Sequence, residues 1–126
     1  MEPNEALAEL LHLSSQIEDA AIVGGSGFVL AASGAPERGE QLARVASELL
    51  AAARDVRPSV DVSRIEVSLG ATSVFVVAEG GRLAVATTVA EPTAGLVVYD
   101  LRTALRRLDE ERAPKTTRKK KDTTDA

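Results

Sequence analysis

The chain has 126 residues, of which 44% are hydrophobic and 2% aromatic, so we expect one domain with a core built mainly from Ala, Val and Leu. The absence of cysteine excludes a disulfide framework, a thiolate metal site and a cysteine nucleophile. The amino-terminal segment carries acidic residues and Pro3 where a signal peptide needs basic residues and an apolar run. No stretch approaches the ~20 apolar residues of a membrane span. We therefore expect a cytoplasmic protein without membrane insertion.

The net charge of −4 at pH 7 combines two segments of opposite sign. Residues 1–111 contain 9 Lys and Arg against 17 Asp and Glu, whereas residues 112–126 contain 6 against 2. The second segment has no apolar pattern, so we predict a folded domain over 1–111 and a basic, disordered tail over 112–126. We interpret the tail as a solubilising or weakly electrostatic segment. Contact with nucleic acid or anionic lipid is the alternative, but the tail lacks interleaved aromatic residues and an apolar anchor, so no specific nucleic-acid partner is expected.

The first third of the chain predicts a helix followed by a hairpin. Asn4 is a candidate N-cap for a helix over residues 4–18, in which apolar residues recur at helical spacing. Two continuous apolar runs, residues 20–23 and 28–32, enclose a glycine-containing turn and indicate a β-hairpin. The apolar side of the helix comprises Leu7, Leu10, Leu11 and Ile17.

The rest of the domain predicts two more helices separated by a strand meander. A second helix is expected over residues 40–56, after a loop at 34–39 that contains Pro36. Pro58 ends this helix, because the residue before a proline avoids helical geometry. A third helix, over residues 93–110, begins beside Pro92. The three strands between these helices are predicted at residues 64–69, 74–78 and 83–86.

The hydrophobic patterns of the strands predict their order in one sheet. The strand at 64–69 alternates polar and apolar residues, as a strand with one solvated face does, whereas strands 1, 4 and 5 are almost entirely apolar. Strands buried on both faces belong in the middle of a sheet, so the predicted order is 2-1-5-4-3, with strands numbered along the chain. We predict an α/β fold (an α+β sandwich) with a mostly antiparallel sheet, helices 1 and 3 on one face and helix 2 on the other.

The order and spacing of these segments resemble the Roadblock/dynein light chain family over about residues 5–110. The matching segments are the hairpin of residues 19–23 and 27–33, the second helix, the strand at 74–78, and Thr93-Ala94-Gly95-Leu96-Val97 at the start of the last helix. The resemblance, to bacterial single-domain members, implies a profilin-like sheet and a homodimer. It also implies a role in binding or regulating small Ras-like GTPases, or in scaffolding larger machines.

The residues themselves also favour a dimer, because an exposed edge strand pairs readily with another strand unless it is covered. The strand at 64–69 has no proline, and pairing two copies of it about a twofold axis would remove the edge. The second helix carries, beside its core side, a stripe of small residues that would allow two helices to approach closely. The alternative is a set of good helix formers facing solvent. The predicted dimer interface comprises Ile65, Val67, Leu69, Ala43, Ser47, Leu50 and Ala51.

Arginines and one tyrosine are candidates for contact with a partner. An activator of GTP hydrolysis can act by inserting an arginine, and Arg44, Arg54 and Arg82 are the candidates, although a surface arginine is usually a solvated charge. Tyr99 is predicted to project from the third helix beside arginines, a combination common in binding hot spots; a solvated pair is the alternative. The predicted partner-binding residues are Arg44, Glu48, Arg54, Tyr99 and Arg102.

No catalytic, cofactor-binding or metal site is predicted. Gly24-Gly25-Ser26-Gly27 lacks the Gly-Lys-Ser/Thr ending of a phosphate loop, and a strand follows it where a helix should begin. His12, the only histidine, falls on the solvent side of its helix. We therefore predict a non-enzymatic homodimeric module that binds and regulates a small Ras-like GTPase. The alternative is a scaffold subunit of a signalling or motility complex without effect on GTP hydrolysis. A small-molecule sensor is a third hypothesis, against which the scarcity of aromatic residues argues.

Overall fold

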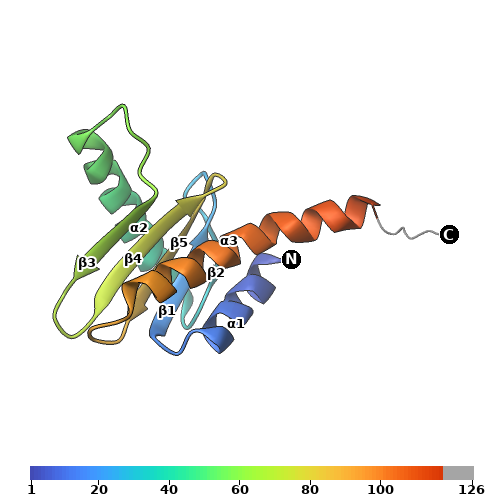
Figure 1. The fold of residues 1–126 in the computed structure, drawn as a ribbon, viewed down its shortest axis with the longest axis horizontal. Coiled ribbons are helices and arrows are strands. Elements are labelled where there is room, and N and C mark those ends of the chain that lie inside the picture. Colours follow the sequence, from blue (N-terminus) through green and yellow to red (C-terminus); the bar gives the residue numbers. More distant parts are fainter. Residues whose placement is uncertain (118–126) are drawn as a thin grey trace.

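The computed structural model describes the backbone of residues 1–117 and the side chains of residues 1–109. Helices and strands follow one another in the predicted order along this part of the chain (Figure 1). Their bounds are α1 (Pro3–Leu13), β1 (Ile17–Val23), β2 (Val29–Ala32), α2 (Pro36–Val56), β3 (Arg64–Ser68), β4 (Ser73–Glu79), β5 (Arg82–Thr88) and α3 (Ala94–Thr117). No helix in the described part of the chain is long and apolar enough to cross a membrane.

The five strands form one sheet in the order β2-β1-β5-β4-β3, as predicted. Each neighbouring pair is antiparallel. The strands with continuous apolar runs, β1, β4 and β5, lie in the middle, because each must bury side chains on both faces. The alternating strand β3 lies at one edge and the short strand β2 at the other. The hydrophobic patterns therefore predicted the sheet order correctly.

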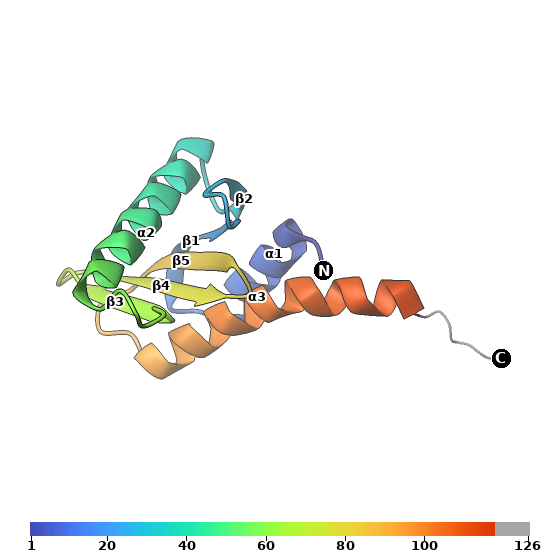
Figure 2. The same ribbon diagram turned by 90° about the horizontal axis from the view of Figure 1, so that it is seen from above.

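The helices cover the two faces of the sheet unequally (Figure 2). On one face, α1 and α3 pack together over a core that includes Ile22, Phe75 and Leu101, all at most 1% exposed. On the other face, α2 packs alone over a smaller core that includes Leu42, Ala46 and Val76. The predicted distribution of helices is confirmed. Because a single helix covers the second face, the side chains of the edge strand β3 on that face are only half-buried.

The first helix is shorter than predicted. It ends at Leu13, and Ile17 lies in β1, where it pairs with Thr88 of β5. Ile17 fits the helical spacing of the preceding apolar residues and also the apolar pattern of the following strand, so the sequence pattern alone did not separate the two elements. The N-cap is Glu2 and not Asn4: Pro3 occupies the first helical position, and the carboxylate of Glu5 accepts a hydrogen bond of 3.1 Å from the backbone N–H of Glu2.

The second helix begins four residues earlier than predicted. Pro36, which was assigned to a loop, is in the first turn, where its fixed φ suits the helix and its missing N–H costs little. Arg38 in the same turn anchors the helix to β1 through Asp19, with the Arg38 Nε and Asp19 Oδ2 atoms 3.3 Å apart. Gly39 follows and is buried against β2.

The third helix continues to Thr117, whereas the prediction ended it at Glu110. Among the residues whose side chains are described, Leu108 is the last buried residue of this helix. The predicted tail of residues 112–126 extends outside the described residues, so its division from the folded domain stays a prediction.

Gly39 allows a close approach between α2 and the sheet. A Cβ atom at this position would lie 2.5 Å from Ala32 Cβ, a distance that two carbon atoms cannot adopt without movement of the helix. We expect Gly39→Ala to lower the free energy of unfolding by about 1 kcal/mol or more, because overpacking of about 1–3 kcal/mol exceeds the gain in helix propensity of at most about 1 kcal/mol.

Urea denaturation of Gly39→Ala, Ala32→Gly and the double variant measures this contact. The double variant removes one methyl group where the other is added. Its loss in the free energy of unfolding should therefore be about 1 kcal/mol smaller than the sum of the losses in the two single variants. Strict additivity of the two substitutions would contradict the packing explanation.

Candidate interaction surface

The edge strand β3 presents a partly apolar strip on the α2 side of the sheet. Ile65 and Val67 are half-buried against the core under α2, while Leu69, one residue beyond the strand, is 60% exposed. The alternate residues Arg64, Glu66 and Ser68 are exposed on the opposite face. The edge is thus amphipathic in the way the sequence predicted, and its role as a dimer interface stays a prediction.

The predicted stripe of small residues on α2 is not a uniform exposed surface. Ala43 and Leu50 are 4% and 8% exposed, whereas Ser47 and Ala51 are exposed. Ala43 packs in the core under α2, and Leu50 lines the hollow between α2 and the sheet. The assignment of Ala43 and Leu50 to a surface beside the core is therefore wrong. The close approach at Gly39 explains the difference, because it turns the side of α2 that carries Ala43 toward the sheet.

The predicted partner-binding residues fall on two separate surfaces. Arg44, Glu48 and Arg54 are exposed on α2, on one side of the sheet. Tyr99 is 65% exposed on α3, which covers the other side, and Arg102 beside it is half-buried. Because the sheet separates α2 from α3, the structure does not bring all five residues into one surface (Figure 2).

Ion pairs divide the arginines into two groups. On α3 and the adjoining β4–β5 hairpin, Arg102 and Arg106 both pair with Glu79, and Arg82 Nη1 lies 2.9 Å from Asp109 Oδ1. Arg107 Nε lies 2.8 Å from Glu9 Oε1 on α1, although the pair does not have the geometry of a directed hydrogen bond. With the Arg38–Asp19 pair, five of the nine arginines in residues 1–109 are neutralised within the chain. The four without an ion pair in the described structure are Arg44, Arg54, Arg57 and Arg64, on α2, the loop after it and β3.

A groove runs along one flank of α2. It joins two hollows of about 690 Å³ and about 350 Å³, both lined by Ser47 of α2 and by Gly27 of the β1–β2 turn. The larger hollow extends toward Arg54 and the smaller one toward Glu40. We call this feature the α2 groove; its α2 side comprises Glu40, Ala43, Arg44, Ser47, Leu50 and Arg54.

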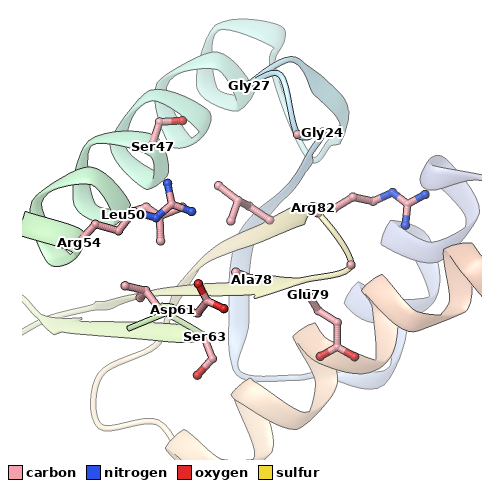
Figure 3. A pocket seen from close by; sticks show the side chains of 15 residues that line it. Gly24, Gly27, Ser47, Leu50, Arg54, Asp61, Ser63, Ala78, Glu79 and Arg82 are labelled. Carbon is pink, nitrogen blue, oxygen red and sulfur yellow. The ribbon is translucent and has the colours of Figure 1, made fainter. Parts of the chain in front are cut away.

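Two charged side chains project into the larger hollow. In Figure 3, the guanidinium group of Arg54 and the carboxylate of Asp61 both point into the space between α2 and the sheet. Glu79 and Arg82, at the edge of the same hollow, point away from it and toward α3, consistent with their ion pairs there. Among the charged residues that line this hollow, Glu79 and Arg82 are therefore paired toward α3, whereas Arg54 and Asp61 form no ion pair in the described structure.

The wall of the groove opposite α2 is formed by glycine turns. A Cβ atom at Gly25 in the β1–β2 turn would lie 3.0 Å from the carbonyl oxygen of Gly81 in the β4–β5 turn, so the two turns meet backbone to backbone. Residues 24–27 connect two antiparallel strands, which confirms the hairpin prediction for this segment. The sequence carries no signal that the two turns meet, because strands from different parts of the chain bring them together.

The described residues contain no group of three or more His, Asp or Glu side chains that could hold a metal ion. His12 is exposed on α1, as its position in the sequence predicted. The α2 groove is open and has a mixed polar and apolar lining, and three of the charged residues that line it, Glu40, Arg44 and Arg54, lie on α2.

Comparison with known proteins gives the fold. The sequence matches no protein-family model and none of the curated proteins. Among solved structures, a Roadblock/LC7 domain from Streptomyces avermitilis superposes with a TM-score of 0.77 at 20% identity, covering 88% of this chain and 98% of that one. The chain has the Roadblock/LC7 fold.

Two further structures extend this likeness. The gliding protein MglB from Thermus thermophilus matches this Roadblock/LC7 fold with a TM-score of 0.69 at 22% identity, covering 85% of this chain and 87% of that one. An MglB described as having a tetrameric arrangement matches with a TM-score of 0.69 at 21% identity and the same coverage of both chains. The resemblance predicted from the sequence is thereby confirmed at the level of the fold.

Proposed function

We propose that this Roadblock/LC7-fold chain is a non-catalytic, homodimeric interaction module that binds and regulates a small Ras-like GTPase. The observation that carries the proposal is the match of most of the chain to Roadblock/LC7 and MglB structures, together with the regulatory role that the family resemblance implies. The surface argument is independent of that match. Within the described residues, the arginines that form no ion pair are Arg44, Arg54, Arg57 and Arg64; they lie on α2 and the segments beside it, where a protein partner could pair with them.

The homodimer in this proposal is supported by the uneven covering of the sheet. The β3 edge carries half-buried Ile65 and Val67 on the face that α2 covers incompletely, and a second copy paired along β3 would bury them. The tetrameric arrangement described for one similar MglB is a case of self-association in the same fold.

The alternative is a scaffold subunit of a signalling or motility complex that has no effect on GTP hydrolysis. It is favoured by the description of the Thermus thermophilus protein as a gliding protein. In this alternative the chain still dimerises, and its α2 surface contacts a partner without changing the partner's chemistry.

Light scattering coupled to size-exclusion chromatography tests the proposal. The chain alone should have the mass of a dimer, and adding a Ras-like GTPase from the same genome should produce a larger complex with the form loaded with a non-hydrolysable GTP analogue but not with the GDP-bound form. Single-turnover GTP hydrolysis should then become faster when the chain is added. Binding without a change in hydrolysis would favour the scaffold, and a monomer that ignores both nucleotide forms would contradict the proposal.

A further inference from the structure

A strip of side chains runs along α3, on the face of the sheet opposite α2. Leu96 and Tyr99 at its start are 55% and 65% exposed, although both are large and apolar over most of their surface. Arg106 follows Tyr99 by seven residues, close to two helical turns, and therefore returns to the same side of the helix. We call this surface the α3 strip; it comprises Leu96, Tyr99, Thr103, Arg106 and Arg107.

The second half of the α3 strip contains a small polar hollow. Its volume is about 200 Å³, and the residues that line it are Tyr99, Thr103, Arg106 and Arg107. Each of these side chains carries hydrogen-bond donors, and none is acidic. The neighbouring dent between α1 and α3 is lined by Glu9 and Asp100, so the nearby carboxylates lie beside the hollow and not around it.

The ion pairs of these arginines use little of their hydrogen-bonding capacity. Arg106 shares the carboxylate of Glu79 with Arg102, and it donates a hydrogen bond to that group only through its Nε atom. Arg107 Nε lies 2.8 Å from Glu9 Oε1, but it is buried and makes no hydrogen bond in the described structure. A guanidinium group has five N–H donors, so most of those on Arg106 and Arg107 have no acceptor among the described residues.

The donors of the hollow and the apolar start of the strip together define the occupant. A guanidinium fork binds a carboxylate group through two parallel hydrogen bonds. A free ion would gain nothing from Leu96 and Tyr99, whereas a protein segment can pack an apolar side chain against them. Tyrosine and arginine are also the residues that dominate protein–protein hot spots. The occupant therefore needs an apolar and an acidic side chain about 10 Å apart, the axial distance between Tyr99 and Arg106.

We propose that the α3 strip binds an acidic segment of a partner protein, with a carboxylate in the hollow beside Arg106 and Arg107 and an apolar side chain against Leu96 and Tyr99. The strip and α2 lie on opposite faces of the sheet, so this surface is separate from the one assigned to the GTPase (Figure 2). A chain that uses both surfaces at once links the GTPase to a second protein.

Two synthetic peptides test the proposal in NMR titrations of the isotope-labelled full-length chain at low salt. The first peptide is helical and carries a leucine and, seven residues along, two adjacent glutamates, which matches the spacing on α3. The second has glutamines in place of the glutamates. The glutamate peptide should shift the backbone amide resonances of Tyr99, Thr103 and Arg106. Its dissociation constant should be at least about fivefold lower than that of the glutamine peptide, which lacks the charge-assisted hydrogen bonds.

Substitutions at the two ends of the strip separate the two contacts. Arg106→Gln should weaken binding of the glutamate peptide at least about fivefold. It should not disturb the fold, because Glu79 keeps its ion pair with Arg102. Tyr99→Ala should weaken both peptides at least about twofold, because it removes the apolar contact that they share. Arg57→Gln is the matched control: it removes the same charge from an exposed arginine outside the strip, so both dissociation constants should stay within about twofold of the wild type.

Three results would overturn this proposal. The first is equal affinity for the two peptides, or no shift with either of them. The second is an Arg106→Gln variant that binds the glutamate peptide as tightly as the wild type does. The third comes from a titration with inorganic phosphate: if phosphate shifts the resonances of the strip and the glutamate peptide does not, the hollow binds a free anion only. None of these results bears on the proposed GTPase contact, which lies on the other face of the sheet.

Discussion

We expect Val67→Lys to convert the proposed homodimer to a monomer while leaving the fold intact. Val67 is half-buried at the edge strand β3, on the side of the sheet that α2 covers only in part. In a monomer the lysine stem can lie along the apolar strip while its ammonium group reaches water. Between two paired copies of β3, two ammonium groups would meet near the twofold axis, where neither water nor a carboxylate compensates for them. Mass from light scattering, with a circular dichroism spectrum to verify folding, measures the result.

Ser68→Lys is the control for this experiment. It adds the same charge to the neighbouring position of the same strand, but its side chain is exposed on the opposite face of the sheet. The control should remain a dimer. If Val67→Lys also remains a dimer, the two copies do not associate through the α2 side of β3.

Phe75→Ala is expected to have the largest effect on stability, lowering the free energy of unfolding by about 3–5 kcal/mol. Phe75 is 1% exposed in the middle strand β4, and it is the largest fully buried side chain among the described residues. It pairs across the sheet with Ala86, whose small side chain cannot fill the space left behind. Since domains of this size are stable by about 5–15 kcal/mol, the variant should unfold at a much lower urea concentration.

The chain supplies a matched control in its other phenylalanine. Phe28 is 74% exposed and lies immediately before β2, so Phe28→Ala removes the same atoms without opening a cavity. Its effect on the free energy of unfolding should stay within about 0.5 kcal/mol. Similar urea midpoints for the two variants would contradict the assignment of Phe75 to the core.

The sequence predicted the sheet more accurately than the surface. Continuous apolar runs can only be buried on two sides, so β1, β4 and β5 were placed in the middle from their residues alone. Helix ends were less certain, because Ile17 fits both a helical and a strand pattern, and Pro36 is compatible with a loop or a first helical turn.

The orientation of α2 and the groove beside it depend on tertiary contacts that have no local signal. Ala43 and Ser47 are one turn apart and equally suited to an exposed stripe, but the contact between Gly39 and β2 buries the first and leaves the second exposed. The wall of the groove is assembled from turns at residues 24–27 and 79–82, whose meeting requires that the strand order be known first.

In the proposed homodimer, the covering of one sheet face by a single helix would make the stability of the fold depend on protein concentration. Apolar surface of β3 that is half-exposed in one copy would be removed from water when a second copy pairs with it, so association would contribute to the stability of the native state. The midpoint of thermal unfolding should then rise with protein concentration. At a low concentration in the cell, where few copies associate, the protein would be less stable. The abundance of the protein would then help to set how stable each chain is.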